Sequence, residues 1–219
     1  QEKGRRMKKF GTFLMIVGVL CIFGAMGLIF YNRMEDEQAG QESASALDEL
    51  KQYIAETAGD PTIVTPEEKE TIKPDINVDD LYDMPTFYNG IYDFVGYIQI
   101  PKLELELPIL DHWDYDRLNV APCRYYGAIA TNDFVIAGHN YPKHFGNLKL
   151  LDINDKVLFY DPKGKVYIYE VKDIQIVDPY KVDLVLDSKH DMALFTCTKN
   201  SQSRVTVFCD LVPKERLQY

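Results

Sequence analysis

Residues 10–31 form a run of 22 residues without a charged side chain. As an α-helix, a run of this length spans about 30 Å, the thickness of the hydrocarbon core of a membrane. Five Lys or Arg precede it within residues 1–9, and Glu35, Asp36 and Glu37 follow it. The positive-inside rule therefore predicts a cytoplasmic N-terminus and an extracytoplasmic remainder of the chain. We predict a single retained membrane helix, with a cleaved signal peptide and a buried core helix as the alternatives.

The negative charge of the chain is concentrated just after this run. The formal net charge at pH 7 is −10. Residues 32–93 hold sixteen Asp or Glu against four Lys or Arg, whereas residues 94–219 hold seventeen against fifteen. Nucleic-acid-binding proteins rely on clustered Lys and Arg, so the acidic charge argues against nucleic acid as a partner.

Residues 32–90 are predicted to be an acidic, partly helical extracytoplasmic stalk, because their acids and prolines disfavour a packed core. Apolar residues recur at helical spacing over residues 45–57, with Ser45 as the expected N-cap. A capping-box pattern beginning at Thr65 predicts a second short helix. The alternative for residues 45–57 is that they pack on the following domain or contact a partner.

Residues 91–219 read as an all-β domain. We predict strands over residues 95–100, 107–110, 125–130, 134–137, 157–160, 166–177, 193–197 and 204–211. Residues 114–120 suit one or two helical turns, and residues 161–164 suit a hairpin turn. About eight short strands with only brief helices favour a closed or nearly closed, antiparallel-rich barrel.

Cys197 is the candidate nucleophile of this domain. It ends a predicted strand and precedes a polar turn, which gives a rigid mount with one open side. The alternative is a cysteine that serves as a small buried apolar side chain. Cys123 and Cys209 are the other cysteines outside the apolar run. Three cysteines cannot all pair, and we hold a bridge between Cys123 and Cys209 open.

His139 is the candidate acid and base. It follows the predicted strand 134–137 and opens a polar loop. An imidazole and a thiol can share a proton near neutral pH, which provides both a thiolate and an acid for the leaving amine. His144, five residues further on, is the competing candidate.

Arg204 opens the last predicted strand, seven residues after Cys197. Two antiparallel strands joined by a short turn place their facing ends side by side. A permanent cation beside the nucleophile can stabilise the oxyanion of a tetrahedral intermediate. The alternative is an arginine that faces solvent at the start of a strand.

Taken in their order and strand settings, Ala137-Gly138-His139, Thr196-Cys197 and Arg204 resemble the signature of sortases. The early segment 96–101 resembles the first barrel strand of that family, and the likeness runs from about Val95 to Leu211. The resemblance implies an eight-stranded sortase-type β-barrel with short helices.

It also implies a cysteine transpeptidase anchored in the membrane by residues 10–31. By this resemblance, the thiolate of Cys197 is expected to attack the Thr–Gly bond of an LPXTG-like sorting signal, and an amine of a cell-wall precursor or a pilin lysine is expected to resolve the acyl-enzyme. Thr196 and Asn140, the neighbours of Cys197 and His139, are expected to contact the substrate.

No cofactor or metal is implied by this reading. Some relatives are activated by calcium, and four acids of one region are the candidates for such a site: Asp178, Asp183, Asp187 and Asp191. Residues 82–88 could cover the substrate groove, although the end of the stalk is the preferred interpretation. A secreted thiol protease and a non-catalytic membrane-tethered barrel are the competing functions.

Overall fold

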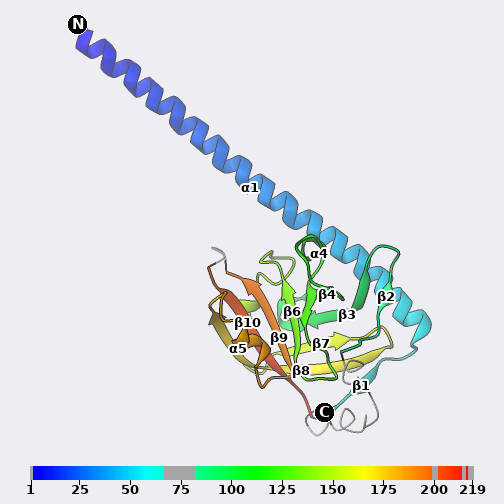
Figure 1. The fold of residues 1–219 in the computed structure, drawn as a ribbon. Coiled ribbons are helices and arrows are strands. Elements are labelled where there is room, and N and C mark those ends of the chain that lie inside the picture. The colour runs from blue at the N-terminus through cyan, green and yellow to red at the C-terminus, as the bar shows by residue number, and fades with distance from the viewer. Residues whose placement is uncertain (1, 67–81, 199–201, 214–215, 217–219) are drawn as a thin grey trace. The chain divides into compact units, whose positions relative to one another are not determined.

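The computed structural model describes residues 2–66, 82–198, 202–213 and 216. Within that part of the chain, eight strands form the barrel: β3 (Asp93–Ile100), β4 (Leu105–Leu110), β5 (Cys123–Tyr126), β6 (Phe134–Gly138), β7 (Lys156–Tyr160), β8 (Lys165–Val177), β9 (Met192–Cys197) and β10 (Arg204–Leu211). They pair in the order β8-β10-β9-β6-β5-β4-β3, and β7 closes the ring because it pairs with both β3 and β8 (Figure 1). The predicted barrel is confirmed.

The barrel is mixed rather than purely antiparallel. β6 runs parallel to β9, and β4 runs parallel to β5. Two short strands extend the sheet: β1 (Thr62–Val64) pairs with β8, and β2 (Phe87–Tyr88) pairs with β3. β3 pairs with β4 along one edge and with β7 along the other, and its register against β4 shifts between Phe94 and Gly96. Gly96 has φ +146°, and a side chain there would collide with the backbone oxygen of Tyr160.

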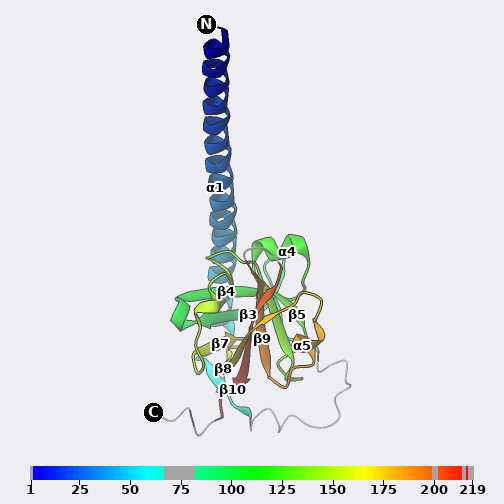
Figure 2. The same ribbon diagram turned by 90° about the vertical axis from the view of Figure 1, so that its left-hand side faces the viewer.

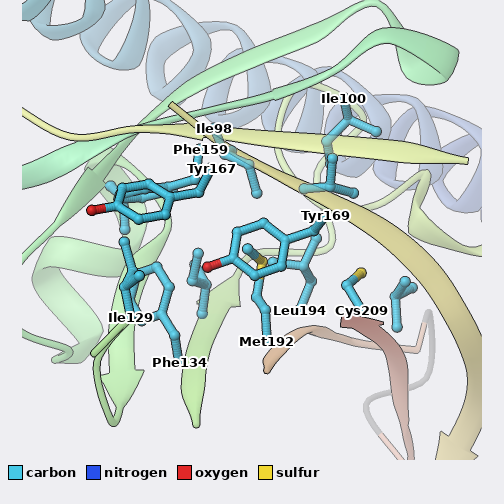
Figure 3. Packing of buried hydrophobic residues seen from close by; sticks show 14 of the residues in the cluster. Ile98, Ile100, Ile129, Phe134, Phe159, Tyr167, Tyr169, Met192, Leu194 and Cys209 are labelled. Atoms are coloured by element: carbon cyan, nitrogen blue, oxygen red, sulfur yellow. The ribbon is translucent and has the colours of Figure 1, made fainter. Parts of the chain in front are cut away.

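The interior of the barrel is filled by one apolar cluster, shown in part in Figure 3. Tyr169 and Phe134 are fully buried in it, and Cys209 lies among them. As the alternation of β10 predicts, Cys209 belongs to this inner cluster, whereas Phe208 belongs to a separate cluster on the outer face.

All four cysteines are free. Cys123 packs in a second cluster together with Leu50 and Phe94, away from the inner cluster that holds Cys209. The suggested bridge between Cys123 and Cys209 is therefore wrong. Burial raises the pKa of the Cys123 thiol to about 12 and also raises that of Cys209, so both behave as apolar core residues.

Short helices lie outside the ring of strands, as Figure 2 shows for α4 (Tyr115–Val120) and α5 (Asp183–Leu186). Single-turn 3₁₀ helices occur at η1 (Pro101–Leu103) and η2 (Leu148–Leu150). Asp114 caps α4 by accepting a hydrogen bond from the backbone N–H of Arg117. The predicted strand 125–130 ends early, at Tyr126, because the chain turns at Gly127 (φ +65°).

The N-terminal helix α1 runs without interruption over Glu2–Thr57. Ser45 lies inside it and is not the N-cap that the sequence suggested. The chain divides into two compact units, residues 1–38 and 39–219. The first unit consists of helix and carries a segment long and apolar enough to cross a membrane.

In the second unit, residues 39–57 of α1 pack on the barrel. Leu50 is fully buried and Ile54 is 8% exposed, and both belong to one cluster with Phe94 and Leu110. Lys51 forms an ion pair with Glu106 of β4. The alternative interpretation of residues 45–57, packing on the domain, is confirmed; composition alone missed it because the buried positions form a narrow stripe among exposed polar residues.

Two further expectations concern the segment between α1 and the barrel. The second stalk helix, expected from Thr65 onward, lies largely outside the described residues. Of residues 82–88, Phe87 and Tyr88 form β2, and the Tyr82 carbonyl accepts a hydrogen bond from Arg124 at 2.9 Å. None of the residues 82–88 lines the pocket described below.

Candidate active site

Three neighbouring strands bring the three candidate catalytic residues to one edge of the barrel. Gly138 of β6 lies opposite Thr196 of β9 in parallel register, so the next residues, His139 just after β6 and Cys197 at the end of β9, lie side by side. On the other side of β9, Arg204 of β10 lies directly opposite Cys197. Residues 65 positions apart in the chain are thus juxtaposed by strand pairing alone.

A pocket of about 250 Å³ lies at this edge and is lined by all three residues. Its remaining walls come from α4 and the segment before it, from β5, and from the connection between β8 and α5. Aromatic side chains make up one wall: Trp113, Tyr115, Tyr125 and Phe195. Tyr125 stands edge-on to both Trp113 and Phe195, at centroid distances of 5.4 and 5.1 Å.

The alternation of β9 places Cys197 on the outer face of the barrel. Met192 and Leu194 belong to the inner cluster, whereas Ala193 and Phe195 contribute to the outer one. Cys197 follows the outer set and is half-buried. A partly exposed thiol at a strand end can meet a substrate that lies in the pocket.

His139 is held by neighbours that the sequence did not single out. Its Nε2 lies 2.8 Å from Oδ1 of Asn119, in α4. Because a carbonyl oxygen only accepts, this contact favours the tautomer with the proton on Nε2. The ring of Tyr141 lies against the imidazole, with centroids 4.7 Å apart. The helical pattern of residues 114–120 was visible in the sequence, but not that it ends beside His139.

His144, the competing histidine, is fully buried and does not line the pocket. Burial, together with the charge on His139, lowers the pKa of His144 to about 4. The imidazole of His144 is therefore neutral at pH 7 and remote from any substrate. These observations favour His139 as the acid and base.

Arg204 is half-buried and faces the same pocket. Its Nη1 donates a hydrogen bond to the backbone oxygen of Ser203 at 3.3 Å, which leaves further guanidinium donors to point toward a substrate. Asp178 and Lys181 also line the pocket, and Asp178 follows Val177, the residue of β8 that pairs with Arg204.

The two expected substrate contacts are not brought to the pocket. Thr196 lies on the inner side of β9, is 2% exposed and does not line the pocket. Asn140 is half-buried in the loop after His139 and is also absent from the lining. The alternation of the strand explains the first case, because the neighbour of an outward nucleophile points inward.

The acids considered for calcium are not gathered in one place. Among the described residues, no group of three or more His, Cys, Asp or Glu is arranged to hold a metal ion. Asp191 instead accepts a hydrogen bond from the backbone N–H of Leu211 at 2.8 Å, and Asp178 accepts one from Tyr180 at 2.9 Å.

Comparison with known proteins identifies the family. A model of the sortase domain matches residues 98–212, which is more than half of the chain. The chain belongs to the sortase family. Membership makes it a cysteine transpeptidase, and the matched region contains the whole edge that carries His139, Cys197 and Arg204. No curated protein matches the sortase at a significant level.

Solved structures of sortases share the fold. The Clostridium perfringens sortase D5 transpeptidase is 21% identical and has a TM-score of 0.53, with 78% of this chain and 99% of that one covered. Sortase A from Corynebacterium diphtheriae is 22% identical at a TM-score of 0.50, covering 82% and 91%. Sortase C-3 from Streptococcus pneumoniae is 20% identical at 0.50, covering 81% and 85%.

Proposed function

We propose that this sortase cleaves the Thr–Gly bond of an LPXTG-like sorting signal and transfers the acyl group to an amine. The convergence of Cys197, His139 and Arg204 on one pocket, from three adjacent strands, is the observation that carries the proposal. The acceptor amine belongs to a cell-wall precursor or to a pilin lysine.

In the first half-reaction, the Sγ thiolate of Cys197 attacks the carbonyl carbon of the threonine. The carbonyl oxygen becomes an oxyanion, and the guanidinium of Arg204 stabilises it. The C–N bond then breaks, the imidazolium of His139 protonates the departing glycine amine, and a thioester remains on Cys197.

In the second half-reaction, the acceptor amine attacks the thioester carbonyl and gives its proton to His139. The C–S bond breaks, and the thiolate of Cys197 is restored together with a new amide bond. The aromatic wall of the pocket suits the apolar part of the signal, because it offers a concave, largely apolar surface beside the nucleophile.

We further propose that α1 is a retained anchor and that the barrel acts outside the membrane. The apolar segment contains 22 consecutive residues without a charged side chain, and the helix that carries it is long and apolar enough to cross a membrane. Lys and Arg precede it and acids follow it, the charge order of a helix with a cytoplasmic N-terminus.

The test is a peptide-library assay with residues 32–219 and several amines, with and without calcium. A ligated product supports transpeptidation, while hydrolysis alone at saturating amine would show a thiol protease. Cys197→Ala should abolish acyl-enzyme formation, and His139→Ala should cost nearly as much because the pair acts as a unit. In the full chain, Cys21→Ala is the matched control and should leave turnover unchanged. If Cys197→Ala retains full function, the non-catalytic barrel is the correct interpretation.

A further inference from the structure

The loop that carries His139 is held together by hydrogen bonds between its own backbone groups. The carbonyl of His139 accepts a hydrogen bond from the backbone N–H of Phe145 at 3.0 Å. The carbonyl of Tyr141 accepts from both His144 and Gly146 at 2.9 Å. Residues 139–146 therefore form one unit, and a displacement of one end of the loop moves the other.

The far end of this loop is packed against α1. His144 is fully buried, and the backbone of Ala39 lies beside its imidazole. Ala39 and Ser43, one helical turn apart, are 5% and 1% exposed. A side chain at Gly40 would collide with the side chain of Lys143, so the loop packs directly on the helix through Lys143.

The ring of Tyr141 connects the two histidines. Its centroid lies 4.7 Å from that of His139 and 5.8 Å from that of His144. Among the described residues, neither ring nitrogen of His144 has a partner in hydrogen-bonding geometry, although the backbone of Ala39 lies close enough to raise the pKa of the imidazole. His144 is thus held by packing and by the nearby backbone of Ala39, and the ring of Tyr141 lies between its ring and that of His139.

We propose that His144 is a positioning residue that ties the His139 loop to residues 39–43 of α1. Docking of this helical segment then sets where the catalytic imidazole stands in the pocket. The inference rests on the proposed role of His139 as acid and base. It also makes the juxtamembrane end of α1 a part of the active-site support rather than a passive spacer.

The experiment uses the full chain in detergent micelles, an LPXTG peptide and an amine acceptor. His144→Ala removes the ring, His144→Phe keeps a ring of similar shape, and Gly40→Leu wedges the loop from the helix. Ala44→Leu is the matched control, because it adds the same side chain at an exposed position of the same helix. His139→Ala reports on the proposed function itself.

We expect His144→Ala and Gly40→Leu each to lower kcat about tenfold or more with KM nearly unchanged, since small misplacements of a catalytic group are costly. A variant that combines His144→Ala with Gly40→Leu should have a kcat only slightly below that of the more impaired single variant, because both changes release the same loop. His144→Phe should retain most of the turnover, and Ala44→Leu should match the unaltered enzyme.

Two outcomes overturn the inference. One is full kcat in Gly40→Leu and His144→Ala while His139→Ala is inactive, which would leave the proposed function standing. The other is a His144→Phe variant as impaired as His144→Ala although its near-ultraviolet circular dichroism shows a native fold. An active His139→Ala variant would instead refute the proposed function.

Discussion

Acid should lower the free energy of unfolding of the barrel, in part through protonation of His144. The pKa of this imidazole falls from its ordinary value of 6.5 to about 4 because the side chain is buried. The unfolded chain therefore binds this proton at a higher pH than the folded protein does. The stability that comes from burying a neutral His144 is therefore fully present above pH 6.5, and it is lost as the pH falls toward 4. Each unit of difference between the folded and unfolded pKa values is worth about 1.4 kcal/mol, so protonation of His144 should lower the free energy of unfolding by about 3 kcal/mol in total.

Urea unfolding of residues 32–219, followed through the fluorescence of the single tryptophan, Trp113, measures this effect at pH 7.5 and 4.5. His144→Phe keeps a ring but removes the titration. Between these pH values the unaltered protein should lose about 2–3 kcal/mol more than the variant. Carboxylates remote from residue 144 contribute equally to both proteins and cancel in the difference. Equal losses in the two proteins would refute the reasoning.

Four further outcomes follow from the contacts. Arg204→Lys should lower kcat by about 10²–10³ in single-turnover assays, because an ammonium cannot reproduce the guanidinium fork; full activity would remove Arg204 from the oxyanion role. Leu50→Ala should lower the free energy of unfolding by about 2–5 kcal/mol, since Leu50 is fully buried between α1 and the barrel, whereas exposed Asp48→Ala should change it by less than about 0.5. Glu170 lies beside Lys156, Lys172 and Arg216, and hydrogen bonding to Lys172 leads the effects that lower its pKa to about 2. Glu170→Gln should therefore lower the free energy of unfolding by about 1–3 kcal/mol at pH 7. Urea unfolding should show the difference between the variant and the unaltered protein becoming smaller as the pH falls from about 4.5 toward 2. Iodoacetamide should modify Cys197 far faster than Cys123 or Cys209, which peptide mapping would reveal; equal rates would contradict their burial.

The sequence was a good guide to the strands and to the barrel. Alternation correctly assigned Cys209 to the interior, because a strand has a period of two whatever lies beside it. It failed at residues 127–130, where Gly127 turns the chain although the neighbouring residues are apolar. It also missed the burial of residues 39–57, since a composition rich in acids does not reveal which face of a helix is covered.

The sequence predicted three residues that the structure brings to one pocket, but not the residues that contact them. His139, Cys197 and Arg204 were singled out because strand ends and turns leave local signals. Asn119 and Tyr141, which contact His139, carry no such signal, because only the folded chain brings α4 and the His139 loop together. Thr196 illustrates the converse, a residue adjacent in sequence that the pleat turns away from the pocket.

The sequence by itself determined the apolar helix, the number of barrel strands and the family, because these depend on length, period and local motif. Only the tertiary structure decided which histidine faces the pocket. His139 and His144 are five residues apart and chemically identical, and the difference between them is burial: one lines the pocket and the other lies against α1 with its pKa lowered to about 4. Burial is a property of neighbours distant in the chain, and the sequence does not state which those are.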